Sequence, residues 1–402
     1  MKGFHIPRRF ALAIFAWVCF LDISHSLSTS SQPPTSTPGQ IANGGVTIDP
    51  LQEIATAEVE KLSSYYSGAD ISNPPTLWLS SGEASSYVRD NIDTVLFDCD
   101  GVLYRTKSPC PGASDCILKL LEMDKKVLFV TNNAGVNRRE LREKLSKILG
   151  IESLTTDQMI SSSYSSAQYL KRKLLDQPIS DNGRKTNRVH VIGSSGLCEE
   201  LESAGFDVTG GPSLPENEDG SMSRDELEEY EFESHDSETS LHPIDALVVG
   251  HDTDLNFRKL CIADNLLLRN PKALFVATNK DSFDVVDGNQ KDPTTRHILG
   301  NGATVVALEY SSRRSAINVG KPSHDLFDLI NEETGVLGDP SRCLFVGDRL
   351  DTDIRFGKDN QMKSLLVMTG VTDAETMENL AGGTEDEPLP DFIAPSVGVL
   401  VE

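Results

Sequence analysis

The chain has little positive charge and no apolar run long enough to cross a membrane. Its 37 Lys and Arg residues face 61 Asp and Glu residues, which gives a formal net charge of −24 at pH 7. A surface of this sign argues against sequence-independent binding of nucleic acid, which needs positive charge to neutralise phosphates. The apolar run at residues 10–21 is too short for a transmembrane helix, so we expect no stable membrane span in the mature chain.

Ordered cysteine spacing is also missing. No second Cys or His pair accompanies Cys110 and Cys116 at the spacing of metal ligands, which argues against a zinc site. The scattered positions also lack the pattern of a disulfide scaffold. We therefore expect buried or free thiols at Cys99, Cys110, Cys116, Cys198, Cys261 and Cys343.

The N-terminal region differs in composition from the rest of the chain. Basic residues precede the apolar run, as in a secretory signal peptide, and residues 27–46 are rich in Ser, Thr and Pro with no acidic residue. The two pieces together resemble the two-part address that directs proteins to plastids wrapped in extra membranes. We expect residues 1–45 to be a targeting region of this kind. Simple secretion is the alternative, and the cysteine pattern weighs a little against it.

From residue 93 onward, strand-like and helix-like segments alternate. A chain of 402 residues, 38% of them hydrophobic, is long enough for two domains. Alternation of this kind predicts parallel sheets covered by helices, here two α/β modules in one chain. Strands are expected at residues 93–98, 126–131, 189–192, 246–249, 273–277, 303–308, 342–346, 364–368 and 391–394. Helices are expected at residues 51–65, 113–123, 138–149, 325–331 and 352–361.

An acidic, Ser-rich stretch at residues 212–242 interrupts this alternation. Arg224 is its only Lys or Arg, and no clean hydrophobic period runs through it. Such a composition predicts a surface loop or a disordered insertion. We expect no partner for it, because a charge run of this sort is usually a solvated face.

The strand at residues 93–98 ends in two carboxylates one residue apart, Asp98 and Asp100. Gly101 follows and gives the backbone freedom to turn sharply. Close carboxylates repel each other, so this pair needs either a shared proton or a bound cation.

Three further apolar segments end in polar groups. They deliver Thr131 and Asn132, then Lys321, then Asp348 and Asp353. Each end alone is more often a turn or a helix cap, but four in one chain point to a shared site. In an open parallel α/β sheet that site lies outside the carboxyl ends of the strands. A hydroxyl, an amide, an ammonium and hard oxygen ligands together suit a phosphate group with Mg²⁺.

These segments resemble the four motifs of the haloacid dehalogenase superfamily. The Thr-Asn-Asn form of the second motif and the sequence of the closing motif narrow the resemblance to large-capped phosphatases of the phosphoglycolate, 4-nitrophenyl phosphate and pyridoxal phosphate group. The matching segments are Asp98-Cys-Asp100-Gly-Val-Leu-Tyr104, Thr131-Asn-Asn, Gly320-Lys321-Pro and Gly347-Asp348-Arg-Leu-Asp-Thr-Asp353. Tyr104 stands where relatives frequently have Trp.

The resemblance implies a Rossmann-like three-layer α/β core with a parallel sheet and an inserted α/β cap domain. The core would comprise residues 46–176 and 317–402. The cap, of the C2 type, would comprise residues 177–316 and carry the acidic insertion 212–242. Caps in this group often pair, which implies a homodimer through the cap.

The resemblance also assigns roles in catalysis. Asp98 would be the nucleophile that forms an aspartyl-phosphate intermediate, and Asp100 would protonate the leaving group and then activate water. Mg²⁺ would be held by Asp98, by the backbone carbonyl of Asp100 and by Asp348.

The remaining motif residues would serve the phosphoryl group. Thr131 and Asn132 would bind its oxygens, and Lys321 would neutralise its charge while orienting the nucleophile. Asp353 would support Lys321 or a metal-bound water. His251 lies where relatives keep their substrate loop and is a candidate for substrate contact, although a lone His near a strand end is more often a packed residue.

The expected function is therefore Mg²⁺-dependent hydrolysis of a small phosphorylated metabolite, with 2-phosphoglycolate as the first choice because it suits a plastid location. A broad 4-nitrophenyl phosphate or pyridoxal phosphate phosphatase is the alternative within the class. A non-catalytic binding module on the same fold is the alternative from another class.

Overall fold

The computed structural model describes residues 49–69, 73–176, 187–212, 220–232, 243–285, 296–381 and 387–401. The expected targeting region at residues 1–45 lies outside these ranges. Within them, every helix is too short or too polar to cross a membrane. The six cysteines named above are free thiols, as predicted.

The larger sheet of the described residues has seven parallel strands in the order β1-β16-β15-β14-β2-β5-β6. Its strands are short apolar runs, and those at the centre are buried on both faces, as in other parallel sheets. The strands are β1 (Thr76–Leu77), β2 (Thr94–Phe97), β5 (Lys126–Thr131), β6 (Met159–Ser161), β14 (Cys343–Gly347), β15 (Lys363–Val367) and β16 (Phe392–Ala394).

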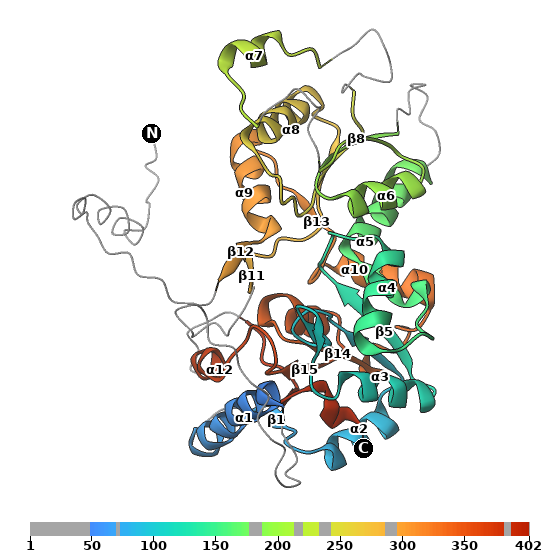
Figure 1. Cartoon of the computed structure of the whole chain (residues 1–402), viewed down its shortest axis with the longest axis vertical. Helices are drawn as coiled ribbons and strands as arrows, with labels where there is room; N and C mark the ends of the chain where they lie inside the picture. Colours follow the sequence, from blue (N-terminus) through green and yellow to red (C-terminus); the bar gives the residue numbers. More distant parts are fainter. Residues whose placement is uncertain are drawn as a thin grey trace, which may run out of the picture. The chain divides into compact units, whose positions relative to one another are not determined.

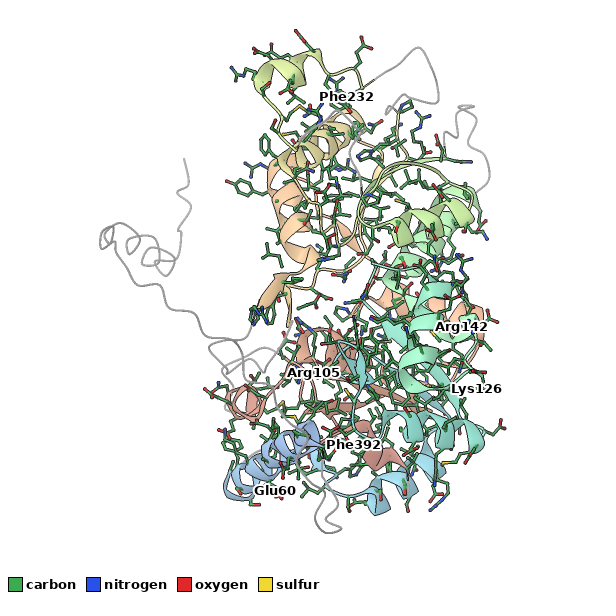
Figure 2. All side chains as sticks on the ribbon, viewed as in Figure 1. Glu60, Arg105, Lys126, Arg142, Phe232 and Phe392 are labelled. Atoms are coloured by element: carbon green, nitrogen blue, oxygen red, sulfur yellow. The ribbon has the colours of Figure 1, made fainter. Side chains whose placement is uncertain are left out.

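Helices flank this sheet on both sides (Figure 1), and side chains fill the space between the layers (Figure 2). Phe97 and Phe129 pack on one face with α3 and α4, and Leu96 and Phe345 pack on the other with α5 and α10. The predicted three-layer α/β fold is thereby confirmed. The helices are α1 (Pro50–Gly68), α2 (Ser81–Asn91), α3 (Ala113–Glu122), α4 (Arg138–Leu149), α5 (Ser162–Leu170), α10 (His324–Thr334), α11 (Arg355–Asp359) and α12 (Ala374–Ala381).

A second parallel sheet, with five strands in the described residues, has the order β13-β10-β9-β7-β8. Helices α8 and α9 lie side by side on one of its faces (Figure 1), and α6 packs on the other. We propose that this unit is the cap domain. Its strands are β7 (Arg188–Ile192), β8 (Asp207–Gly210), β9 (Ala246–Val249), β10 (Leu274–Ala277) and β13 (Ile317–Asn318). Its helices are α6 (Ser195–Ser203), α7 (Arg224–Glu229), α8 (Phe257–Arg269) and α9 (Asn301–Ser312).

Two small antiparallel pairs accompany the sheets. Strands β3 (Tyr104–Arg105) and β4 (Ser108–Pro109) pair just after the first motif. Strands β11 (Phe283–Val285) and β12 (His297–Leu299) form a second pair, which belongs to the proposed cap.

The cap was expected to end at residue 316, two residues before the end of the second sheet. Strand β13 pairs with β10 through Ile317 and Asn318, so the sheet ends only at Asn318. A strand of two residues is too short to leave a periodic pattern in the sequence.

Helix α5 packs against both sheets. Tyr164, in its first turn, belongs to the apolar core under the larger sheet. Ala167, Tyr169 and Leu170, farther along the same helix, belong to the core of the second sheet. One helix therefore contributes to two hydrophobic cores.

The strand predicted at residues 303–308 is wrong, because this segment belongs to α9. Its run Ala-Thr-Val-Val-Ala-Leu is apolar and β-branched, and a run this short does not separate strand from helix. The buried residues Thr304, Val305, Leu308 and Ser312 recur at helical spacing. They form the face that packs on the second sheet.

The loop expected throughout residues 212–242 is also wrong for its described part, residues 220–232. Ser223 and Glu226 form a capping box that begins the short helix α7. Met222 and Phe232, on either side of it, are buried in the core of the second sheet. These two apolar residues hold the segment against the second sheet. Because they are isolated, they leave no hydrophobic period in the sequence.

Candidate active site

Three neighbouring strands of the larger sheet bring the expected site residues to one edge. Strand β2 lies between β14 and β5, and all three run in the same direction, so their carboxyl ends meet. Asp98 follows β2, Asp348 follows β14, and Thr131 is the last residue of β5. The backbone N–H of Asp98 extends the ladder by donating to the carbonyl of Val346 at 2.9 Å.

Lys321 reaches the same place from the segment after β13. Its side chain is almost fully buried, and Nζ donates to Oδ1 of Asp98, to Oδ1 of Asp353 at 2.8 Å and to the carbonyl of Val130 at 3.0 Å. An ammonium has three hydrogens, so these acceptors use all of them. The side chain is therefore fixed against Asp98.

Burial and mutual repulsion dominate the electrostatics of this cluster. Burial raises the pKa of Asp98 well above its ordinary value, although Lys321 opposes the effect. Burial, reinforced by Asp353, also raises the pKa of Asp348 to about 7. Burial alone would lower the pKa of Lys321, but the carboxylates of Asp353 and Asp98 outweigh it and raise that pKa.

A divalent cation fits this charge distribution. Asp98, Asp348 and Asp353 each place a carboxylate oxygen within 4.8 Å of the other two. Three carboxylates around one ammonium leave two negative charges in excess, and hard oxygen donors are the ligands that Mg²⁺ prefers. Asp353 is already engaged by Lys321 and, through Oδ2, by two backbone N–H groups at 3.1 Å each. Asp98 and Asp348 are the carboxylates left to face a cation.

Two glycines make room for the carboxylate of Asp348. A Cβ added at Gly370 would lie 1.9 Å from its Oδ2, and one added at Gly101 would lie 2.5 Å from the same atom. Gly101 also has a φ of 81°, a conformation that favours glycine. The backbone N–H of Val371 donates to this Oδ2 at 2.7 Å. Close backbone packing therefore fixes the orientation of Asp348.

The side chain of Asn132 joins three segments of the chain. Its Oδ1 accepts the N–H of Lys321 at 2.8 Å, and its Nδ2 donates to Asp281 at 2.9 Å and to the carbonyl of Lys321 at 3.3 Å. Both amide hydrogens are used, so a bond from Asn132 to a phosphoryl oxygen has to come from its backbone. Thr131 accepts the N–H of Asn133 at 3.1 Å, and its hydroxyl hydrogen has no acceptor among the described residues.

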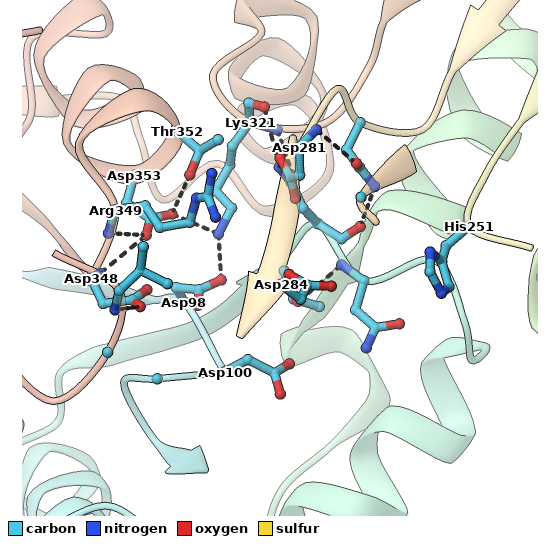
Figure 3. A pocket seen from close by; sticks show the side chains of 18 of the residues that line it. Asp98, Asp100, His251, Asp281, Asp284, Lys321, Asp348, Arg349, Thr352 and Asp353 are labelled. Carbon is cyan, nitrogen blue, oxygen red and sulfur yellow. Dashed lines mark hydrogen bonds and ion pairs between the residues drawn. The ribbon is translucent and has the colours of Figure 1, made fainter. Parts of the chain in front are cut away.

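A cavity of about 320 Å³ opens in front of this cluster and is lined by all the site residues predicted from the sequence. Figure 3 shows Asp98 beside Lys321 and Asp348, whereas Asp100 and His251 lie apart from them. Asp100 is solvent-exposed and lines the cavity, although protein atoms surround it on its other sides. Burial raises its pKa, against the opposing charge of Lys144.

Among the further residues that line the cavity and were not predicted are Asn279, Asp281, Asp284 and Arg105. Asn279 and Asp281 follow β10 closely, so the strand-end argument would have found them if applied to the second sheet. Burial raises the pKa of Asp281 to about 6, against the opposing charge of Arg349. Arg105 and Asp284 lie on very short strands and had no spacing signal.

Comparison with known proteins gives the family. A family model described as a haloacid dehalogenase-like hydrolase matches residues 95–207, and a second, HAD-hydrolase-like model matches residues 318–400. Phosphoglycolate phosphatase 2 of Arabidopsis thaliana is 37% identical over 313 residues, which cover 78% of this chain and 93% of the relative. This chain belongs to the haloacid dehalogenase-like hydrolases.

Other members of the family point to the same enzyme class. Phosphoglycolate phosphatase 1A, chloroplastic, of A. thaliana is 33% identical over 310 residues, 77% of this chain and 76% of the relative. A p-nitrophenyl phosphatase from Archaeoglobus fulgidus is 26% identical with a TM-score of 0.57, over 77% of this chain and 98% of that one. A glycerol phosphate phosphatase from Mycobacterium tuberculosis, solved in complex with magnesium, is 25% identical with a TM-score of 0.56, over 78% of each chain. The predicted class, a phosphoric monoester hydrolase of the haloacid dehalogenase-like family, is confirmed.

Proposed function

We propose that this enzyme is a Mg²⁺-dependent phosphatase that works through an aspartyl-phosphate intermediate and prefers 2-phosphoglycolate. The observation that carries the mechanism is the buried carboxylate of Asp98, held by Lys321 beside Asp348 at the cavity. A carboxylate fixed in this way is oriented for attack on one bound group.

The proposed reaction has two steps. A carboxylate oxygen of Asp98 attacks phosphorus, the bond from phosphorus to the ester oxygen breaks, and the leaving oxygen takes a proton from the carboxyl group of Asp100. Water then attacks the aspartyl phosphate, gives a proton to Asp100, and breaks the bond between phosphorus and Asp98. Phosphate leaves, and both carboxyl groups return to their starting states.

Asp98, the backbone carbonyl of Asp100 and Asp348 are the groups that we expect to hold Mg²⁺. When bound, the ion would reduce the repulsion between the nucleophile and the phosphate. The magnesium complex of the M. tuberculosis relative supports this choice of cofactor.

The phosphoryl oxygens would be bound by the hydroxyl of Thr131 and the backbone of Asn132. Lys321 would neutralise part of their charge while it holds Asp98. Asp353 would act through Lys321, to which it is bonded at 2.8 Å.

Four basic side chains line the cavity, and we propose that two of them, Arg105 and His251, face the carboxylate of phosphoglycolate. Relatives named phosphoglycolate phosphatase support this substrate. The carboxylate of Asp284 lines the same cavity and would repel the carboxylate of phosphoglycolate. Aryl phosphates and pyridoxal phosphate, which carry no carboxylate, are therefore the alternative substrates.

The test is the steady-state kcat/KM of the processed enzyme with Mg²⁺ on phosphoglycolate, glycerol phosphate, pyridoxal phosphate and 4-nitrophenyl phosphate. We expect phosphoglycolate to exceed the others by about tenfold or more, the size of one charge-assisted contact. A flat profile would remove phosphoglycolate as the preferred substrate. Absence of turnover on all four would favour the non-catalytic binding module.

We also propose a homodimer through the cap. Helix α9 carries an apolar stripe on its exposed side, formed by Ala303, Val306, Ala307 and Tyr310 at helical spacing. Val306 is 60% exposed and Tyr310 is 73% exposed. A second copy of the same helix, packed about a twofold axis, would cover the stripe with itself.

Residues 1–45 remain a proposed plastid address, with secretion as the alternative. The chloroplastic location in the name of one relative supports the proposal. A fluorescent protein fused after residue 50 would decide, because plastid fluorescence and release into the medium exclude each other.

A further inference from the structure

The carboxyl group of Asp100 is bonded to a buried tyrosine. The hydroxyl of Tyr104 lies 2.6 Å from Oδ2 of Asp100, a length typical of a hydrogen bond between a hydroxyl and a carboxylate. Tyr104 is 1% exposed and packs in the core under the larger sheet. The backbone holds the two residues together as well, because the N–H of Gly101 donates to the carbonyl of Tyr104 at 2.9 Å.

Lys144 of α4 fixes the direction of this hydrogen bond. Its Nζ lies 2.8 Å from the Tyr104 hydroxyl oxygen and 4.1 Å from the centre of the ring. An ammonium only donates, so the hydroxyl oxygen accepts from Lys144 and its own hydrogen is directed to Asp100. The positive charge on one side strengthens donation on the other.

The two oxygens of Asp100 therefore differ. Oδ2 is held by Tyr104, whereas Oδ1 has no hydrogen-bond partner among the described residues and the group faces the cavity. A carboxyl group held by one oxygen can exchange a proton through the other without rotating away.

We propose that Tyr104, itself oriented by Lys144, is the positioning residue that keeps Oδ1 of Asp100 directed at the reacting phosphate ester. This inference rests on the proposed two-step mechanism. In it, Oδ1 gives a proton to the leaving oxygen in the first step and takes one from water in the second. Tyr104 keeps its own hydrogen throughout and contacts neither the substrate nor the transferred proton.

A buried tyrosine also needs a partner for its hydroxyl for reasons of stability alone. A positioning role and a purely structural role of Tyr104 predict different effects of its loss on esters with different leaving groups. A 4-nitrophenolate leaves without protonation, whereas an alkoxide such as that of glycolate needs the proton of Asp100. Loss of a positioning residue therefore affects alkyl phosphates more than aryl phosphates, and loss of a packing contact affects both equally.

The experiment compares wild type and Tyr104→Phe, which removes only the hydroxyl, on phosphoglycolate and 4-nitrophenyl phosphate. We expect kcat/KM on phosphoglycolate, which reports the first step, to fall by about 10- to 100-fold, part of the range known for acid–base catalysis. The loss of kcat/KM on 4-nitrophenyl phosphate should be at least about fivefold smaller, because 4-nitrophenolate needs no proton from Asp100 in that step.

Lys144→Met should lower kcat/KM on phosphoglycolate more than on 4-nitrophenyl phosphate, as Tyr104→Phe does, but by less. The double variant should have the same kcat/KM as Tyr104→Phe, because Lys144 acts through the Tyr104 hydroxyl. Lys147→Met, the same change one turn along α4 at an exposed position, is the matched control and should match wild type. Multiplicative losses in the double variant would overturn the order of action that we propose.

Two outcomes separate this inference from the proposed function. A wild type that hydrolyses neither ester contradicts the function itself. A wild type that turns over normally, with kcat/KM of Tyr104→Phe unchanged or lowered equally on both esters, overturns only the positioning role.

Discussion

Arg349 donates a hydrogen bond from Nη1 to the backbone carbonyl of Phe283 at 3.1 Å. Arg349 belongs to the closing motif beside Asp348, whereas Phe283 begins strand β11 of the proposed cap. The guanidinium carbon also lies 5.5 Å from the centre of the Phe283 ring, on which His297 stacks at 4.4 Å. The closing motif, which carries Asp348, is thus in direct contact with the small β11–β12 pair of the proposed cap.

Arg349→Lys should loosen this contact, because an ammonium cannot replace the planar guanidinium that reaches both Asp351 and the Phe283 carbonyl. We expect KM to rise by about threefold to tenfold, the size of one hydrogen bond to a charged group, and kcat to change less. Steady-state kinetics measures both. Arg342→Lys, at the exposed pair with Asp93, is the matched control, and an equal effect there would contradict the prediction.

Asp98→Asn should abolish turnover while the fold is kept, because the substitution removes the nucleophile without changing the shape of the side chain. We expect kcat to fall by about 10⁴-fold or more. Circular dichroism checks the fold, and Asp359→Asn, the same change at an exposed residue of α11, is the control. Normal hydrolysis by the Asp98 variant would show that another group attacks phosphorus.

Mg²⁺ should stabilise the folded enzyme even without substrate. Asp98 and Asp348 lie in a cluster with excess negative charge, and a ligand present at about 100 times its dissociation constant adds about 2.7 kcal/mol to the free energy of unfolding. Differential scanning calorimetry with and without Mg²⁺ measures the rise in Tm. Asp348→Asn should lose most of that rise, and an unchanged rise in the variant would place the ion elsewhere.

Acid should destabilise the second sheet through His190. Burial lowers the pKa of His190 to about 4, and its Nδ1 lies 3.0 Å from the hydroxyl of Thr209. The unfolded chain takes up a proton near the usual pKa of about 6.5 while the folded one does not. The stabilisation that neutral, buried His190 provides is therefore fully present above a pH of about 6.5. It is lost as the pH falls toward the pKa of about 4 in the folded protein.

Urea unfolding at pH 7 and pH 5 tests the effect of His190. The wild type should lose about 2 kcal/mol more than His190→Asn between these two values, a difference that follows from the two pKa values. An equal loss in both proteins would mean that other groups carry the acid sensitivity.

Val306→Lys should convert the proposed dimer to a monomer, because a charge would be buried in the apolar stripe of α9. Size-exclusion chromatography with light scattering measures the mass. Ile54→Lys, the same kind of change at a 51% exposed residue of α1, should leave the mass unchanged. A wild type that is monomeric at all concentrations would remove the proposed interface.

The core of the enzyme was predictable because its elements carry their signals locally. The strand expected at residues 126–131 is β5, residue for residue, and the helix expected at residues 138–149 is α4. Asn137 and Glu140 form the capping box that begins this helix, so residues close together in the sequence determine where it starts. The order of the motifs at strand ends then predicts which side chains share an edge.

The details of the site depend on partners that are far apart in the chain. The amide of Asn132 is used by Lys321 and Asp281, which lie 189 and 149 residues away. No sequence pattern around Asn132 indicates that its side-chain amide already has these partners, which leave only the backbone of Asn132 for a bond to phosphate. The same holds for Tyr104, because its partner Lys144 lies 40 residues away on α4 and leaves no pattern around Tyr104.

Helix α5 couples the stability of the two sheets. Tyr164 is buried under one sheet and Leu170 under the other, so excision of the cap would leave half of this helix as an apolar patch open to water. We therefore expect the two sheets to unfold together in one cooperative transition. A cap taken from another member of the family would have to bring a matching half of α5 with it.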